Sequence, residues 1–165
     1  MNDVLHDSLR KGLLDIVIGP LGTRDEELTE LPIMDDEVVV AASAEHPLAG
    51  RDVPMEALCE HRWILSPTSV ATRQWLEAAF RNRRLPAPDV AIVSSSMASM
   101  RNLMVVTGLL SFISSRNLAA NPGLVEVRNT ATAMPRRFGI DHRADAYLSP
   151  ATRRFIEILQ QQGGA

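Results

Sequence analysis

Two short runs of hydroxyl side chains stand where a small molecule could be bound, each directly after an apolar segment. Hydroxyl and backbone N–H groups at a turn from a strand into a helix suit a carboxylate or a hydroxylated ligand. The alternative is simple N-capping, which needs one Ser or Thr per helix and contributes ~1 kcal/mol. The candidate binding residues of these two runs are Ser66, Pro67, Thr68, Ser69, Ser95 and Ser96.

A third turn, Gly-Pro-Leu-Gly at residues 19–22, ends another apolar segment and could face the same cleft. It lacks the further glycines of a dinucleotide-binding fingerprint and the lysine of a phosphate-binding loop. A nucleotide site is therefore not expected here.

The residues that could support catalysis or metal binding are scattered. No histidine stands beside a Cys or Ser nucleophile motif, and the one cysteine, Cys59, is expected in the core. The acidic group at residues 35–37 lacks the ligand pattern of a calcium loop and indicates a solvated entry to a strand. The sequence predicts no catalytic residue, no metal and no cofactor. A small α/β enzyme stays an alternative, which a strongly shifted pKa in the cleft would favour.

Apolar periodicity defines the elements that must position these turns. It predicts helices at 3–11, 70–81, 97–107, 117–120 and from 150 onward, and strands at 15–20, 31–34, 38–42, 63–65, 90–93, 109–113, 124–127 and 138–140. Pro32 cannot donate to a ladder, so its strand is expected at a sheet edge. The alternation predicts an α/β fold with mostly parallel sheets.

Composition narrows the class. The chain has 165 residues, of which 45% are hydrophobic, and it contains no apolar run of ~18 residues that could span a membrane. No signal peptide is visible, so a cytoplasmic protein is expected.

The charge is distributed unevenly along the chain. Residues 1–60 carry 14 acids and 4 bases (net −10), whereas residues 61–165 carry 6 acids and 13 bases (net +7). The bases are scattered, and the tightest group, at 81–84, falls at a predicted helix C-terminus, where cations complement the dipole.

The order of several segments resembles that of a known family. The segments are Leu-Leu-Asp-Ile-Val-Ile-Gly at 13–19, Asp-Glu-Val-Val-Val-Ala at 36–41 and His-Pro-Leu-Ala at 46–49. They are followed by the Trp-Ile-Leu strand, by Arg73 on the next helix and by a closing apolar helix. Together they are similar to the effector-binding region of LysR-type transcriptional regulators, and the similarity covers nearly the whole chain.

The resemblance implies a fold like that of type 2 periplasmic binding proteins, with two Rossmann-like α/β lobes joined by two crossover strands and the first lobe incomplete. The implied segments are 1–37 as the remnant of the first lobe, 38–43 as a crossover strand, 44–136 as the complete second lobe, 137–142 as the return crossover, and 143–165 as a C-terminal segment and helix on the first lobe.

The resemblance also implies a function and partners. A small effector, anionic or hydroxylated, would bind in the cleft between the lobes, at the two hydroxyl turns together with Pro20, Leu21 and Phe112. The family's N-terminal helix-turn-helix is missing here, so DNA would be contacted only through that absent domain. A homodimer through the incomplete first lobe is expected, because an unpaired sheet edge can pair with another chain. The alternative is a solute-binding protein of the same fold associated with transport.

Overall fold

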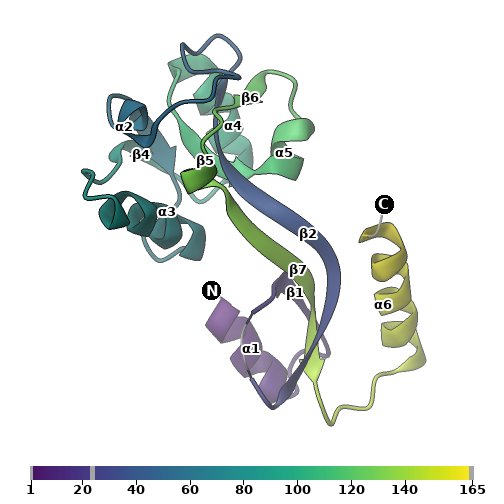
Figure 1. The fold of residues 1–165 in the computed structure, drawn as a ribbon. Coiled ribbons are helices and arrows are strands. Elements are labelled where there is room, and N and C mark those ends of the chain that lie inside the picture. Colours follow the sequence, from purple (N-terminus) through teal and green to yellow (C-terminus); the bar gives the residue numbers. More distant parts are fainter. Residues whose placement is uncertain (1, 23–24, 164–165) are drawn as a thin grey trace. The chain divides into compact units, whose positions relative to one another are not determined.

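The computed structural model describes residues 2–22 and 25–163 (Figure 1). The chain forms two compact units: unit 1 comprises Met1–Asp36 and Arg136–Ala165, and unit 2 comprises Glu37–Pro135. Two long strands, β2 (Leu28–Ser43) and β7 (Met134–Arg143), each begin in one unit and end in the other.

Unit 1 is a small sheet with helices. Its elements besides the ends of β2 and β7 are α1 (Asn2–Arg10), β1 (Val17–Pro20) and α6 (Pro150–Gly163). β1 pairs antiparallel with β7, and Leu9, Val17 and Leu28 form a small buried cluster. Gly139 of β7 must be glycine, because a Cβ there would overlap the carbonyl oxygen of Leu31.

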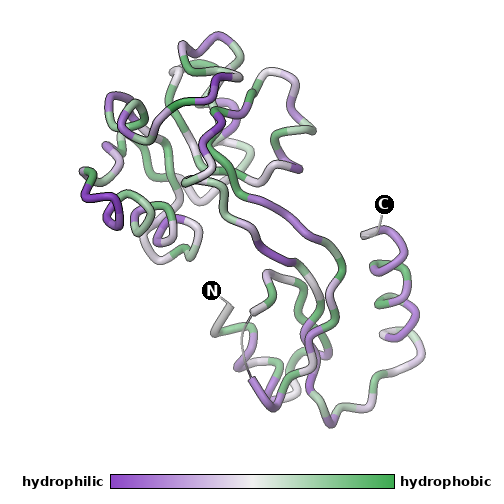
Figure 2. The backbone as a smooth tube through the Cα atoms, in the orientation of Figure 1, coloured by the Kyte–Doolittle hydropathy of each residue, from purple (hydrophilic) through white to green (hydrophobic). Residues whose placement is uncertain are grey.

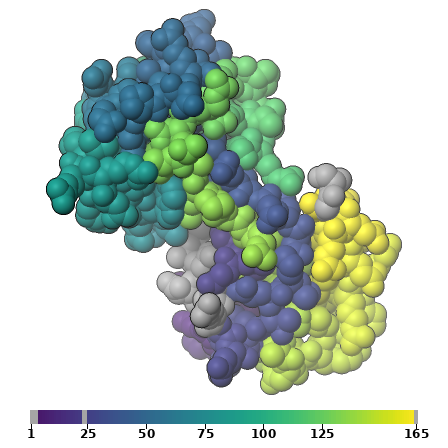
Figure 3. Space-filling view, viewed as in Figure 1, coloured from purple at the N-terminus to yellow at the C-terminus, as the bar shows by residue number. Residues whose placement is uncertain are grey.

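Helix α6 begins as its sequence predicts. Pro150 is its first residue, and the Ser149 Oγ accepts a hydrogen bond from Thr152 N at 3.1 Å, which caps the helix. Ile156 is buried, and the C-terminal Gly163 lies against Ile33 of β2 with no room for a side chain. In the space-filling view α6, in yellow, forms one surface of unit 1 (Figure 3).

Unit 2 is built from strands connected by helices. Its elements are α2 (Met55–Leu58), β3 (Arg62–Leu65), α3 (Ala71–Asn82), β4 (Asp89–Val93), α4 (Met97–Thr107), β5 (Ser111–Ser114), α5 (Ser115–Ala119), β6 (Leu124–Glu126) and the 3-10 helix η1 (Thr130–Thr132). β3 pairs parallel with β4, and on its other side the parallel bridge between Trp63 and Leu110 connects it to the chain entering β5. β5 and β6 pair antiparallel with β2.

The core of unit 2 lies on both faces of this sheet. Val38 and Val40 of β2 belong to the cluster that contains Phe80 of α3, whereas Ala41 belongs to the cluster that contains Met104 of α4. Alternate residues of β2 therefore face different helices, as expected for an apolar run covered on both sides. Figure 2 shows the apolar part of β2 in green next to its polar middle in purple.

Two expectations about the strands are wrong. The sheets are not mostly parallel, because β1–β7, β2–β5 and β2–β6 are antiparallel; the strand–helix alternation that produces parallel pairing extends only from β3 to β5. The two strands expected at 31–34 and 38–42 are one continuous strand, β2. Pro32 does not interrupt it and is exposed, as an edge position permits.

The acidic group at 35–37 is also not wholly solvated, because Asp36 is buried in an ion pair with Arg136. No helix within residues 2–22 and 25–163 is long and apolar enough to cross a membrane.

Candidate functional site

The two hydroxyl turns lie side by side in unit 2. We call residues 66–69, which follow β3, the β3 bend, and residues 94–96, which follow β4, the β4 bend. Because β3 and β4 are parallel, both bends lie at the same edge of the sheet. The backbone N–H of Ser94 donates a hydrogen bond to the carbonyl of Leu65 at 3.0 Å, which connects the ends of the two strands. The structure thus brings together two turns that are 28 residues apart.

Three carbonyl groups of the β3 bend are hydrogen-bonded within unit 2. The carbonyl of Ser66 accepts from Arg73 Nη1 at 3.2 Å, that of Pro67 accepts from Val70 N at 3.0 Å, and that of Thr68 accepts from Gln74 Nε2 at 2.9 Å. The backbone of Val70 and two side chains of α3 therefore occupy three of the bend's carbonyl acceptors.

Five donors of the same bend have no partner among the described residues. In a planar trans peptide the C=O and N–H groups point in opposite directions. Holding the Pro67 and Thr68 carbonyls toward α3 therefore turns the N–H groups of Thr68 and Ser69 away from it. Among the described residues, these two N–H groups and the hydroxyls of Ser66, Thr68 and Ser69 have no hydrogen-bond partner. The first turn of α3 lacks a side-chain cap as well. The bend therefore leaves these donors available to a ligand, whereas three of its carbonyl acceptors are already bonded.

The β4 bend divides its hydroxyls between two tasks. The Ser96 Oγ accepts from Ser99 N at 3.3 Å and so caps α4, and the Ser94 Oγ accepts from Ser96 N at 3.2 Å. Ser96 therefore fulfils the capping alternative, and the Ser94 hydroxyl is bonded within the bend. Ser95 is exposed, and its hydroxyl bonds to none of the described residues. Of this run, Ser95 is the residue free for a ligand.

Phe112 of β5 is part of the packed wall of unit 2 rather than an exposed contact. Its ring is buried and stacks on that of Trp75 from α3, with ring centroids 5.8 Å apart and planes 5° apart. It therefore fixes the position of α3 against the sheet.

The remaining two candidate residues belong to unit 1. Pro20 ends β1 opposite Phe138, and the backbone N–H of Leu21 donates to the carbonyl of Arg137 at 2.8 Å. The Leu21 side chain lies against Gly139.

One residue of this region, Arg73, belongs to the segments that resemble the family, but the sequence predicts no role for it. Arg73 is buried, and its Nε donates to Glu77 Oε1 at 2.5 Å while its Nη1 reaches the bend. The available signal was an arginine in the first turn of a helix, four residues before a glutamate, directly after a candidate binding turn.

Unit 1 contains a buried polar pair that sequence reasoning also missed. His6 Nε2 of α1 lies 2.9 Å from Asp141 Oδ2 of β7, and both side chains are buried. Burial raises the pKa of Asp141, and its Oδ1 has no hydrogen-bond partner among the described atoms. The pair connects α1 to the sheet.

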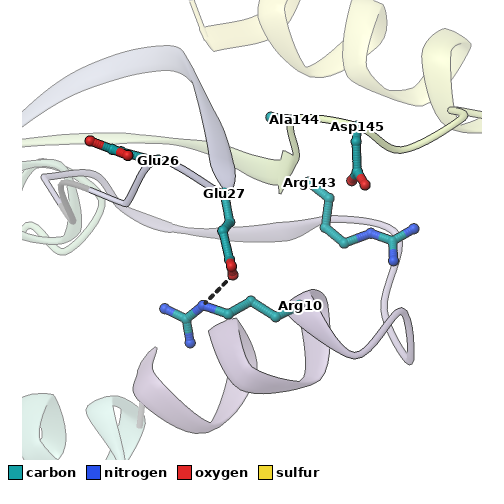
Figure 4. Close-up of a pocket in the computed structure, with 6 residues that line it drawn as sticks. All are labelled: Arg10, Glu26, Glu27, Arg143, Ala144 and Asp145. Atoms are coloured by element: carbon teal, nitrogen blue, oxygen red, sulfur yellow. Dashed lines mark ion pairs between the residues drawn. The ribbon is translucent and has the colours of Figure 1, made fainter.

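Unit 1 also has an open pocket of about 340 Å³ (Figure 4). Arg10 is engaged there with Asp7, Asp25 and Glu27, and its hydrogen bond lowers the pKa of Asp25. The lining carries charges of both signs, of which Arg10 and Glu27 are paired with each other, and it therefore favours no one ligand class. The lining residues are Arg10, Glu26, Glu27, Arg143, Ala144 and Asp145.

Two further titratable side chains, His46 and Cys59, are buried or partly buried within unit 2. His46 is buried, its Nδ1 accepts from Leu48 N at 3.1 Å, and its ring lies edge-on to His61. Burial, with the neighbouring His61, lowers the pKa of His46. Burial raises the pKa of the Cys59 thiol. Within the described ranges, no group of three His, Cys, Asp or Glu side chains could hold a metal ion.

Two units connected by two strands, with a donor-rich edge at the strand ends, define a ligand-binding α/β domain. The chain belongs to the LysR substrate-binding domain family, whose model matches residues 1–164. The family resemblance of the sequence is thereby confirmed. This is a family of effector-binding domains of transcriptional regulators rather than of enzymes.

Individual relatives agree with this assignment. The chain is 29% identical over 164 residues to the HTH-type transcriptional regulator GalR of Pseudomonas putida, covering 96% of this chain and 41% of that regulator. It is 31% identical over 99 residues to the HTH-type transcriptional regulator GbpR of Azospirillum brasilense, covering 58% of this chain and 29% of the other. The chain thus spans less than half of these curated relatives.

Solved structures share the fold. The regulatory domain of CcmR from Synechocystis PCC6803, in complex with 2-PG, superposes with a TM-score of 0.83 at 21% identity and covers 97% of this chain and 78% of that one. The effector-binding domain of QuiR in complex with shikimate gives a TM-score of 0.74 at 18% identity, with coverage of 98% and 77%. The chain has the mixed α/β fold of these regulatory domains.

Proposed function

We propose that this chain is the effector-sensing part of a LysR-type transcriptional regulator and that the β3 and β4 bends bind the effector. The observation that carries the proposal is the arrangement of the β3 bend. Three of its carbonyls are hydrogen-bonded, whereas two of its N–H groups and its three hydroxyls have no partner among the residues that the structure describes. The curated relatives are HTH-type regulators, and this chain corresponds to less than half of the first. Transcriptional output, and a cytoplasmic location beside DNA, would be properties of the whole regulator, with DNA bound by an N-terminal domain.

The proposed ligand is a small molecule with an anionic or hydroxylated group. Unpaired N–H donors and the positive end of a helix dipole favour negative charge. The ligands named for the two similar domains are 2-PG and shikimate. We therefore infer that an acidic metabolite places its anionic group at Thr68, Ser69 and Ser95.

Three less polar residues are proposed to take part in ligand binding. Pro20, at the end of β1, and Leu21, which follows it, would contact a ligand, as the resemblance to the family implies. Phe112, which is buried, would act by supporting α3.

We also propose that the chain forms a homodimer through unit 1. Val4, Leu13 and Ile18 expose large apolar side chains, and β1 is the end strand of its sheet within the described residues. Such an edge offers unpaired backbone groups to a second chain. Light scattering on wild type and Ile18→Lys tests this: we expect a dimer that the charge disrupts, and a monomeric wild type at micromolar concentration would contradict it.

Calorimetric titration with 2-PG, shikimate and inorganic phosphate tests the binding proposal. The double variant Thr68→Val, Ser95→Ala removes two exposed hydroxyls that bond to no described residue, so we expect a folded protein that binds about tenfold more weakly or worse. Thr107→Val at the opposite end of α4 is the matched control, because its hydroxyl bonds back to the carbonyl of Leu103. Equal affinity in the double variant would remove the bends from the site.

A further inference from the structure

One peptide group of the β3 bend has a hydrogen-bond acceptor and no donor. Residue 67 is proline, so the peptide between Ser66 and Pro67 has a carbonyl and no N–H. Turned outward, this carbonyl would repel an anionic ligand. The structure holds it inward by one side-chain donor, Arg73 Nη1 at 3.2 Å.

Gln74 does the same for the next exposed acceptor. Its Nε2 donates to the carbonyl of Thr68 at 2.9 Å, and the trans geometry of that peptide then directs the Ser69 N–H to the opposite side. Gln74 is exposed and makes no other side-chain hydrogen bond to the described residues. Adjacent residues of α3 thus hold the two outer carbonyls of the bend.

We propose that Arg73 and Gln74 are positioning residues for ligand binding, which set the orientation of the Ser66 and Thr68 carbonyls and so leave N–H and hydroxyl groups of the β3 bend, rather than these two carbonyls, facing the ligand. This inference rests on the proposed function. Neither side chain contacts the ligand itself; both act through the backbone of the bend.

The surroundings of Arg73 show that it acts by geometry rather than by charge. It is buried, and its Nε is paired with Glu77 Oε1 at 2.5 Å, so its positive charge is largely compensated. An apolar side chain at position 73 would avoid the cost of removing the charges of Arg73 and Glu77 from water. The guanidinium instead reaches the two acceptors from two different nitrogens of its planar fork, whereas a lysine ammonium has a single nitrogen.

The test uses the full chain and four variants: Gln74→Met, Arg73→Met, Arg73→Lys, and Arg81→Met as a control on the same helix. Two quantities are measured for each. The first is affinity for 2-PG, shikimate and inorganic phosphate. The second is the hydrogen-exchange rate of the Val70 N–H, which is bonded to the Pro67 carbonyl, with the amides of β2 as an internal reference for global unfolding.

We expect Gln74→Met and Arg73→Met to weaken binding of the probes about 5- to 10-fold and to accelerate Val70 exchange by a similar factor, with the β2 amides unchanged. Arg73→Lys should not rescue either quantity, and Arg81→Met should behave as wild type. Unchanged affinity and exchange in Gln74→Met and Arg73→Met would overturn the inference.

The outcomes separate this inference from the proposed function. If wild type binds none of the three probes, the proposed function fails for these ligands while the exchange rate still decides whether α3 positions the bend. If Arg73→Met does not fold, the exposed Gln74 carries the test alone. Weaker probe binding accompanied by an equal acceleration of exchange at the β2 amides would mean general destabilisation and would count against the inference.

Discussion

The ion pair between Asp36 and Arg136 allows a stability prediction with a magnitude. Arg136 Nε and Nη2 lie 2.7 and 2.6 Å from Asp36 Oδ2, and the side chains expose 19% and 2% of their surfaces. The guanidinium also lies over the ring of Phe138, 4.6 Å from its centroid. Arg136→Met removes both charge-assisted hydrogen bonds and leaves a buried carboxylate. Such a loss costs about 3–5 kcal/mol, and we expect about 3 kcal/mol because Arg136 is partly exposed.

Urea unfolding followed by circular dichroism measures this change, and thermal unfolding should show a drop of roughly 6–12 °C. A double-mutant cycle with Asp36→Asn isolates the pair, with an expected coupling of at least about 1 kcal/mol. The matched control is the neighbouring exposed pair of Arg137 and Asp35, 3.8 Å apart; Arg137→Met should cost no more than about 0.5 kcal/mol. Additive effects of the two Asp36 and Arg136 substitutions, or equal losses in both pairs, would refute the reasoning.

Three further predictions concern packing and pH. Phe112→Ala should destabilise the protein by about 3–5 kcal/mol in urea unfolding, because its buried ring stacks on Trp75; a loss below about 1 kcal/mol would show that the stack is dispensable. Gly139→Ala should lower the melting temperature strongly, because its Cβ would overlap a backbone carbonyl of β2, and a fully stable variant would exclude that close approach. Burial and the neighbouring His61 lower the pKa of His46 in the folded protein, so the unfolded chain takes up the proton first as pH falls below about 6.5. Stability should therefore decrease from pH 7 toward pH 5, and less so in His46→Asn; an equal pH dependence in both proteins would contradict this.

The proximity of the two candidate turns follows from the sequence. Apolar runs before residues 66 and 94, with a helical pattern between them, imply parallel strands whose ends meet at one edge. The structure confirms the parallel pair and the contact between Ser94 and Leu65. The sequence also predicts the cap at Ser96, because serine before an amphipathic segment is a strong signal for the start of a helix.

Other features depend on contacts that no local pattern encodes. The continuity of β2 through Pro32 depends on what pairs with it and not on its own propensity. Asp36 stands in an acidic run typical of exposed chain, and its partner Arg136 is 100 residues away. Likewise the donors of Arg73 and Gln74 could be assigned to bend carbonyls only once α3 had been placed against the bend.

The most direct test of the account is a map of the residues that a ligand perturbs. A ¹⁵N-labelled sample titrated with 2-PG, shikimate and inorganic phosphate reports each backbone amide separately. We expect saturable shifts centred on the amides of Thr68, Ser69 and Ser95. Shifts confined to the unit 1 pocket around Arg10 and Arg143 would contradict the account.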